Sequence, residues 1–215
     1  MSSRGKFITL EGPEGSGKST HAEVLVERIM SAGHQVIVAR DPGTTDAGEA
    51  IRDLLKQDLG NEPLCRETEL FLFLAARAQL VRQVILPALK KGVHVVCDRF
   101  ADSTTAYQGY GRKCDLKNLL KMNDFAVQGL VPDITILLDI DVSDGLKRVE
   151  RRGAGTGSEK DRIEREEQAF HERVRAGYLD LARRWPDRFR RVDTSRPIDE
   201  VKDEVWREVR RVIEG

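Results

Sequence analysis

The residues from Gly12 to Thr20 combine glycines, a lysine and hydroxyl side chains at a spacing that suits phosphate binding. They fit the pattern GxxxxGK[ST], in which backbone N–H groups turn inward around phosphate oxygens. Lys18 would reach the β- and γ-phosphates, and the Ser19 hydroxyl would bind Mg²⁺. The competing interpretation is an ordinary glycine-rich turn. We expect this segment to bind a nucleoside triphosphate through Gly12, Pro13, Glu14, Gly15, Ser16, Gly17, Lys18, Ser19 and Thr20.

A second group of charged residues follows later apolar runs. Arg40 begins the turn Arg-Asp-Pro-Gly-Thr-Thr, and Asp98 and Arg99 follow the run from Val93 to Cys97. Asp98 can orient water bound to Mg²⁺, and the planar fork of Arg99 suits a second phosphate group. The competing interpretation of an Asp-Arg pair is a surface salt bridge. The position directly after a buried strand favours a ligand site instead.

Phe73 and Arg77 lie four residues apart in a predicted helix and therefore on one face of it. A ring that stacks and a guanidinium that donates hydrogen bonds could together recognise a nucleobase. Alternatively, Phe73 belongs to the core with its leucine neighbours, and Arg77 extends outward to solvent. Spacing alone favours this second interpretation.

Apolar strands alternate with amphipathic helices along the chain, as in a parallel sheet that is covered on both faces. The predicted strands are residues 6–10, 35–39, 93–97, 134–139 and 189–192. The predicted helices are residues 21–32, 47–57, 67–90, 116–128, 143–152, 161–184 and 198–213, the first of them stopped by Gly33. The Gly/Ser cluster from Gly153 to Ser158 is expected to be a mobile loop. The pattern predicts one α/β domain whose ligands bind at the carboxyl ends of the strands.

Composition restricts the class of protein. The chain has 215 residues, 36 basic and 36 acidic, so its formal net charge is zero. A protein that grips nucleic acid usually has a basic surplus, so nucleic acid is not an expected partner. The three cysteines are far apart and suggest neither disulfides nor a zinc site. No signal segment or long apolar run is evident, and we expect a soluble, cytoplasmic protein that does not bind membranes.

Five motifs, in register over nearly the whole chain, resemble those of the bacterial thymidylate kinases. They are FITLEGPEGSGKST, RDPGTT, FLFLAAR, DRFADSTTAYQGYGR and the DRIE that follows VPDITILLDIDVSDGLKRVERRG. The SxxAYQGxGR element is the specific one, because phosphate loops are shared by many unrelated enzymes. The resemblance implies a P-loop NTPase fold over residues 1–215, with a five-stranded parallel sheet and a mobile lid at about 150–165. It also implies a homodimer that uses ATP and Mg²⁺ to convert dTMP to dTDP for dTTP synthesis.

The same resemblance implies roles at the acceptor nucleotide. Phe73 would stack on thymine and Arg77 would contact a base carbonyl. Tyr107 would lie under the deoxyribose and disfavour a 2′-hydroxyl. The acceptor phosphate would be bound by Arg99 with support from Arg40. The polar wall around the base would be completed by Ser103, Thr104 and Gln108.

Catalytic roles follow from the resemblance in the same way. Glu14 would meet the 3′-hydroxyl or the metal shell, and Ser19 and Asp98 would serve the metal. The phosphate loop has no arginine, so the lid would supply the catalytic arginines. Arg152 and Arg162 match that pattern, whereas Arg151 has no clear counterpart. The implied catalytic set is therefore Lys18, Arg152, Arg162, Glu14 and Arg99.

Three departures from the family pattern concern detail. Asp41 replaces the usual Glu and is shorter, Thr44 replaces a Gly that normally samples positive φ, and the lid is several residues longer. Three other interpretations were weighed. A kinase of another nucleoside monophosphate would share the mechanism. A regulatory GTPase would need DxxG and NKxD, which do not occur, and a partner-driven ATPase would be expected to end a strand in Asp-Glu.

Overall fold

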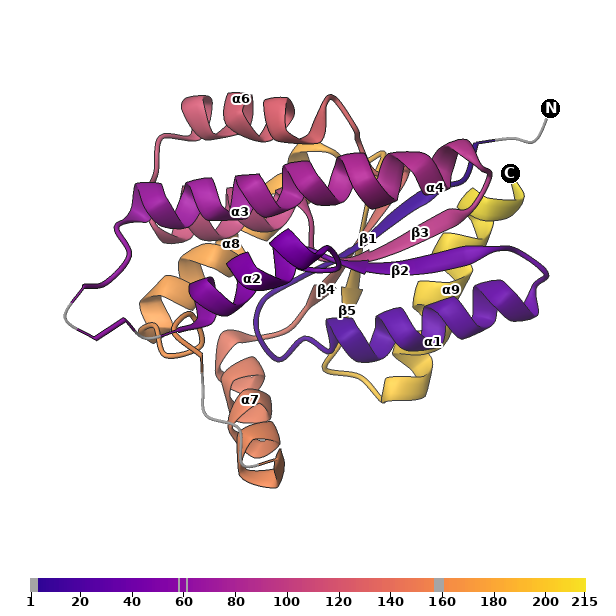
Figure 1. The fold of residues 1–215 in the computed structure, drawn as a ribbon. Helices are drawn as coiled ribbons and strands as arrows, with labels where there is room; N and C mark the ends of the chain where they lie inside the picture. Colours follow the sequence, from indigo (N-terminus) through magenta and orange to yellow (C-terminus); the bar gives the residue numbers. More distant parts are fainter. Residues whose placement is uncertain (1–3, 58, 61, 157–160) are drawn as a thin grey trace.

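The structure, a computed structural model, describes residues 4–57, 59–60, 62–156 and 161–215. One parallel sheet with the strand order β2-β3-β1-β4-β5 forms the centre of the molecule (Figure 1). The strands are β1 (Phe7–Glu11), β2 (Val36–Arg40), β3 (His94–Asp98), β4 (Ile134–Asp139) and β5 (Phe189–Asp193). The predicted five-stranded parallel sheet is confirmed. Because all strands run the same way, the segments that follow them meet at one edge.

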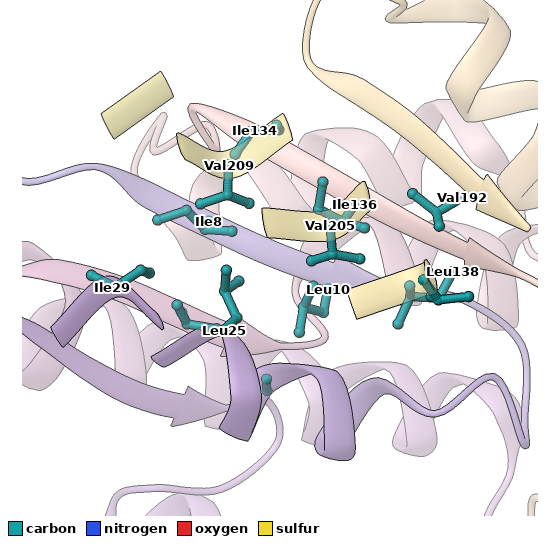
Figure 2. Close-up of a cluster of buried hydrophobic side chains, with 13 residues drawn as sticks. Ile8, Leu10, Leu25, Ile29, Ile134, Ile136, Leu138, Val192, Val205 and Val209 are labelled. Atoms are coloured by element: carbon teal, nitrogen blue, oxygen red, sulfur yellow. The ribbon is translucent and has the colours of Figure 1, made fainter. Parts of the chain in front are cut away.

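Two helices cover one face of the sheet, namely α1 (Lys18–Ser31) and α9 (Ile198–Glu214). Figure 2 shows their aliphatic side chains meeting those of the strands, with Leu25 and Ile29 of α1 facing Ile8 and Leu10 of β1. Val205 and Val209 of α9 close the same cluster. The helix α1 ends at Ser31, and Gly33 follows it with a φ of 86°, as predicted for a C-terminal stop. This cluster anchors the helix that begins at the phosphate loop.

The other face is covered by one long helix together with α6 (Leu116–Val127) and α8 (Gln168–Arg184) (Figure 1). The long helix runs through α3 (Arg66–Leu80), a π-helical stretch η1 (Val81–Ile85) and α4 (Leu86–Lys90). By length and composition alone, Arg66–Lys90 could cross a membrane. In the fold its apolar face packs on the sheet, with Leu80, Val81 and Ile85 fully buried. The shorter α2 (Asp46–Lys56) packs beside α3.

A helix that the sequence did not predict follows β3. It consists of α5 (Ala101–Thr104) and the π-helical stretch η2 (Thr105–Gly111). Its sequence is rich in Thr, Ser and Gly, which have modest helix propensity, and it lacks an apolar stripe. The buried face is instead largely polar, with Asp102, Ser103 and Gln108 all buried. Packing against α8 and hydrogen bonds of its buried polar groups stabilise this helix in place of an apolar stripe.

The boundaries around the expected lid were predicted wrongly. The helix α7 (Val142–Thr156) continues through Gly153 and Gly155, where a loop was expected. Glycine in a helix costs about 1 kcal/mol relative to alanine but does not forbid the helix. Residues 157 and 158 of the expected loop, and residues 159 and 160 of the expected lid, lie outside the described residues. The helix expected from residue 161 begins only at Gln168, because the Asp161 carboxylate accepts hydrogen bonds from the N–H groups of Ile163 and Glu164 and forms a turn.

Candidate active site

A cleft of 960 Å³ lies at the carboxyl edge of the sheet. Most of the site residues predicted from the sequence line it, although they come from five separate segments. They are Glu14, Gly15, Gly17, Lys18, Ser19, Thr20, Arg40, Phe73, Arg77, Asp98, Arg99, Ser103, Thr104, Tyr107, Gln108 and Arg152. Gly12, Pro13, Ser16 and Arg162 are not among the described lining residues. Basic side chains outnumber acidic ones along the cleft, which suits an anionic ligand in a chain with no net charge.

The phosphate loop depends on glycine where the backbone is most crowded. Gly15 has a φ of 72°, and a Cβ atom there would lie 2.1 Å from the carbonyl oxygen of Gly145 at the start of α7. Gly17 has a φ of 86° and precedes α1 directly. The loop therefore fits tightly between β1 and α7 and leads into a helix N-terminus, where N–H groups and the helix dipole favour anions.

Lys18 is folded back over this loop. Its ammonium group donates hydrogen bonds to the carbonyl oxygens of Gly12 (3.1 Å) and Pro13 (2.9 Å) and to the hydroxyl of Ser16 (3.3 Å). Burial, together with the positive charge of Arg99, lowers the pKa of Lys18 to about 8. Among the described residues, no carboxylate forms an ion pair with this ammonium, and a bound polyphosphate would supply such an anionic partner.

Ser19 and Asp98 meet at the mouth of the cleft, where the Ser19 hydroxyl donates a 2.7 Å hydrogen bond to the Asp98 carboxylate. In the described ranges, no group of three or more His, Cys, Asp and Glu side chains is arranged to hold a metal. Mg²⁺ needs no such cage, because it keeps several waters and takes one or two protein oxygens plus phosphate oxygens. The all-oxygen pair beside the phosphate loop therefore fits Mg²⁺ delivered with a nucleotide.

Arg99 occupies the centre of the cleft in a left-handed conformation with a φ of 68°. One terminal nitrogen donates to the Gly12 carbonyl and to the hydroxyls of Ser103 and Tyr178, at 3.1 to 3.3 Å. The other terminal nitrogen donates to Glu14 at 2.7 Å, and the guanidinium lies 4.9 Å from the centre of the Tyr107 ring. These contacts hold a second cation beside Lys18, since both side chains donate to the Gly12 carbonyl oxygen.

Glu14 is shared by the two sides of the cleft, since its carboxylate also accepts a 2.7 Å hydrogen bond from the Tyr107 hydroxyl. Burial alone would raise the pKa of Glu14, but the charges of Arg99 and Lys18 lower it to about 2. Glu14 is therefore ionised at neutral pH and ties Tyr107 to Arg99.

Glu11 is a functional-site residue that the sequence analysis missed. It is fully buried below Arg99 and accepts hydrogen bonds from the backbone N–H groups of Phe100 and Ser103 and from the hydroxyls of Ser103 and Tyr178. These four bonds fix the turn that carries Arg99. Burial raises the pKa of Glu11 to about 7, with a smaller contribution from Asp102. Glu11 is the last residue of β1 and directly follows the apolar run of that strand in the sequence.

This buried carboxyl makes stability depend on pH. The pKa of Glu11 is raised from 4.5 to about 7 on folding, so the folded protein binds the proton more tightly than the unfolded chain. Stability should therefore fall as pH rises from about 4.5 to 7. Glu11→Gln cannot ionise, and its amide can donate to the two hydroxyls. We expect its free energy of unfolding, measured with urea, to exceed that of the wild type by up to about 3 kcal/mol above pH 7 and to converge with it near pH 5. A pH-independent difference would contradict this.

The long helix contributes Phe73 and Arg77 to the cleft. Phe73 is half-buried and lines the cleft, so it is not simply a core residue. Arg77 is only 1% exposed and does not extend to solvent. It donates to Asp41 at 2.5 Å, to Asn123 at 2.7 Å and to the Phe100 carbonyl at 3.3 Å. The shorter Asp41 therefore still reaches a partner and orients Arg77 beside Phe73.

The turn after β2 accommodates its departure from the family pattern. Thr44 adopts a φ of 68°, a conformation that favours glycine. Its hydroxyl accepts a 2.8 Å hydrogen bond from the backbone N–H of Arg40, and its own N–H donates to Glu49 at 2.6 Å. Glu49 also pairs with the Arg40 side chain at 2.9 Å. Local hydrogen bonds thus compensate for the strain, and Arg40 is held at the rim of the cleft.

Thr104 and Gln108 line the same cleft as Phe73, and both are 1% exposed. The Gln108 amide nitrogen donates a 2.9 Å hydrogen bond to Glu69. Glu69 was missed by the sequence analysis, although it lies four residues before Phe73, which itself lies four before Arg77. That repeated spacing on one helix face was the available signal. Ser103, predicted to belong to this wall, lines the cleft and also contacts Glu11, Tyr178 and Arg99.

The two arginines that were expected in a lid, Arg152 and Arg162, occupy different places. Arg152 lines the cleft and pairs with Glu164. Arg162 pairs with Glu69 at 2.6 Å and donates to the Leu55 carbonyl at 3.3 Å, away from the phosphate loop. The structure adds cations that the sequence analysis did not single out. These further basic residues of the cleft are Arg52, Lys56, Arg148 and Arg165.

Comparisons with known proteins agree with this geometry. The family model described as thymidylate kinase matches residues 10–205. The chain is 49% identical to a thymidylate kinase of Nitratidesulfovibrio vulgaris over 209 residues, which cover 96% of this chain and 97% of that protein. It is 47% identical to a thymidylate kinase of Deinococcus radiodurans over 205 residues, which cover 95% of this chain and 96% of that protein.

Proposed function

The chain belongs to the thymidylate kinase family, and from that premise we propose that it transfers the γ-phosphoryl group of ATP to dTMP, giving dTDP and ADP. One observation carries the proposal for this site. Lys18 and Arg99 place two phosphate-binding cations in one cleft, with Phe73 and Arg77 at its far end. A kinase needs room for two phosphate-bearing ligands, whereas a switch or a simple ATPase needs one.

We assign the donor nucleotide to the phosphate loop. The N–H groups of the loop and Lys18 would bind the β- and γ-phosphates, and Ser19 with Asp98 would hold Mg²⁺. When bound, the ion would neutralise charge on the phosphates and align them. Glu14, ionised and tied to Arg99, would accept a hydrogen bond from the acceptor sugar or from water around the metal.

We assign the acceptor to the other half of the cleft. Arg99 would bind its phosphate, with Arg40 at the rim in support. Phe73 would stack on the thymine, and Arg77 would donate to a base carbonyl through an N–H left over from its bonds to Asp41 and Asn123. Tyr107, buried beside Arg99, would close the space around the sugar, so that a 2′-hydroxyl is disfavoured. The other polar residues of the base wall are Ser103, Thr104 and Gln108.

Phosphoryl transfer passes through a loose transition state with charge spread over the transferred group, so alignment and charge stabilisation dominate catalysis. Lys18 and the lid arginines Arg152 and Arg162 would supply that stabilisation. Arg152 already lines the cleft, whereas Arg162 would have to leave Glu69. Closure of the lid over both nucleotides would exclude water, which otherwise hydrolyses ATP.

We further propose a cytoplasmic homodimer. Leu70 and Leu74 of α3 pack on α6 within the chain and are not available to a partner. Phe71 of α3 and Phe125 of α6 are 58% and 87% exposed, and large exposed rings on neighbouring helices suit a partner surface. A particle mass of 24.3 kDa at equilibrium in solution would contradict the dimer.

The test of the function is ADP release from Mg·ATP by the purified protein. It should be measured with dTMP, dUMP, UMP, CMP, AMP and GMP, without acceptor, and with excess chelator. We expect strong turnover with dTMP, little without acceptor and none with chelator. Turnover with another acceptor alone would favour the related monophosphate kinase, and acceptor-independent turnover would favour an ATPase.

A further inference from the structure

Glu69 is a buried carboxylate beside the base end of the cleft. It is 1% exposed on α3, one helical turn before Phe73. Its Oε1 accepts hydrogen bonds from the Gln108 amide nitrogen at 2.9 Å and from Nε of Arg112 at 3.1 Å. Its Oε2 accepts from Arg112 at 3.2 Å and pairs with Arg162 at 2.6 Å. Each carboxylate oxygen of Glu69 therefore has two hydrogen-bonding or ion-pair partners.

The chemistry of this contact decides which way the Gln108 amide points. An ionised carboxylate only accepts hydrogen bonds, so Gln108 must turn its NH₂ group toward Glu69. Burial would raise the pKa of Glu69, but the hydrogen bond and charge of Arg112, with Gln108 and Arg162, hold it below its usual value. Among the residues that the structure describes, none donates a hydrogen bond to Oε1 of Gln108. Gln108 lines the cleft, and the polar atom it has left for a ligand is an acceptor.

We propose that Glu69 is a specificity-positioning residue, which orients the Gln108 amide so that the base site presents an acceptor. A pyrimidine with an N–H at position 3, as in thymine or uracil, can donate to that oxygen. Cytosine carries an unprotonated acceptor at the same position and would be repelled. The inference rests on the proposed placement of the base between Phe73 and Gln108 and explains how one wall of that site selects the base.

The variant Glu69→Gln should reverse this orientation. Its single oxygen would stay with the two arginines at Oε2, since a hydrogen bond from Arg112 and the ion pair with Arg162 meet there. The new NH₂ group would then occupy the Oε1 position and face Gln108, because only one arginine nitrogen donates there. Gln108 could satisfy it only with its own oxygen, so the Gln108 NH₂ group would turn to the cleft. The base site would then present the Gln108 NH₂ group, a hydrogen-bond donor that suits the acceptor nitrogen at position 3 of cytosine.

The experiment compares kcat/KM for dTMP with kcat/KM for 5-methyl-dCMP, which keeps the methyl group and alters only the base edge. We expect Glu69→Gln to lower the dTMP preference at least about tenfold, mainly through KM for dTMP. Glu67→Gln, the same change at an exposed position of α3, should leave the ratio unchanged. Glu69→Asp keeps an acceptor-only group and should retain the preference for dTMP.

If Glu69 had a purely structural role, Glu69→Gln would lower kcat/KM equally for dTMP and 5-methyl-dCMP. The ratio of the two values would then be unchanged, and this result would overturn the inference. Wild-type protein that phosphorylates neither nucleotide would instead overturn the proposed function. Should Glu69→Gln fail to fold, side-chain amide exchange measured by NMR in the wild type decides the question. The Gln108 NH₂ protons should exchange much more slowly than those of exposed Gln128, and equal rates would overturn the inference.

Discussion

Replacing Lys18 with methionine is expected to lower kcat for dTMP phosphorylation by about 10²- to 10³-fold, the usual cost of removing one preorganised charge-stabilising donor. Methionine keeps the length and apolar stem of the side chain but removes the ammonium group. That group now spans Gly12, Pro13 and Ser16, where a γ-phosphate would lie between it and the loop N–H groups. Single-turnover rates at saturating ATP would separate this effect from weaker nucleotide binding.

A matched control is available on the same helix. Arg28→Met also removes one positive charge from α1, but near its far end, where Arg28 pairs with Asp203. Its turnover should match the wild type, because such a partly exposed pair contributes little. If Lys18→Met retained wild-type kcat while Arg28→Met did too, Lys18 would have no part in transfer and the donor assignment to the phosphate loop would be wrong.

The fold was predictable because its signals are local. Four of the five strands contain a short apolar run, whereas β5 reads Phe-Arg-Arg-Val-Asp and gives a weaker signal. The helices on both faces carry apolar stripes, so periodicity identified them. The phosphate loop was found for a related reason, since its glycines and Lys18 serve one backbone conformation. The motifs of the family then aligned the remaining segments, and the structure brings those segments to one cleft.

What could not be predicted depends on buried polar contacts between distant segments. Glu11 lies one residue beyond the predicted first strand, and only the fold shows that Tyr178, 167 residues later, donates to it. The helix of α5 and η2 has the same origin, because its inner face is held by hydrogen bonds and no hydrophobic periodicity marks it. Periodicity measures hydrophobic burial and does not register buried charge.

Arg77 shows how the two kinds of information combine. Spacing alone favoured an outward-pointing side chain, which is the common fate of arginine on a helix. The structure buries it instead, because Asp41 of a different segment supplies a carboxylate at 2.5 Å and removes the cost of an unpaired charge. Such a partner cannot be identified from one helix, and the same is true of Glu69, whose partners come from η2 and from the lid.

The second large effect is expected from Arg162→Ala, which should lower kcat by about 10³-fold or more while leaving KM for dTMP nearly unchanged. An arginine that reaches the transferred group is worth about 10³ to 10⁵ in rate in comparable phosphoryl transfers. In the structure Arg162 is held by Glu69 and the Leu55 carbonyl, so it would act only after the lid closes. Steady-state kinetics with both substrates varied would separate kcat from KM.

The control for this variant is Arg151→Ala, which removes an exposed arginine from the same lid helix and should retain wild-type kcat. A different result for Arg162→Ala would assign the residue another role. If kcat were retained but KM for dTMP rose and the preference over 5-methyl-dCMP fell, Arg162 would act only by holding Glu69 against Gln108. The split between kcat and KM therefore decides whether the contact seen here is a resting position of a catalytic arginine or its working position.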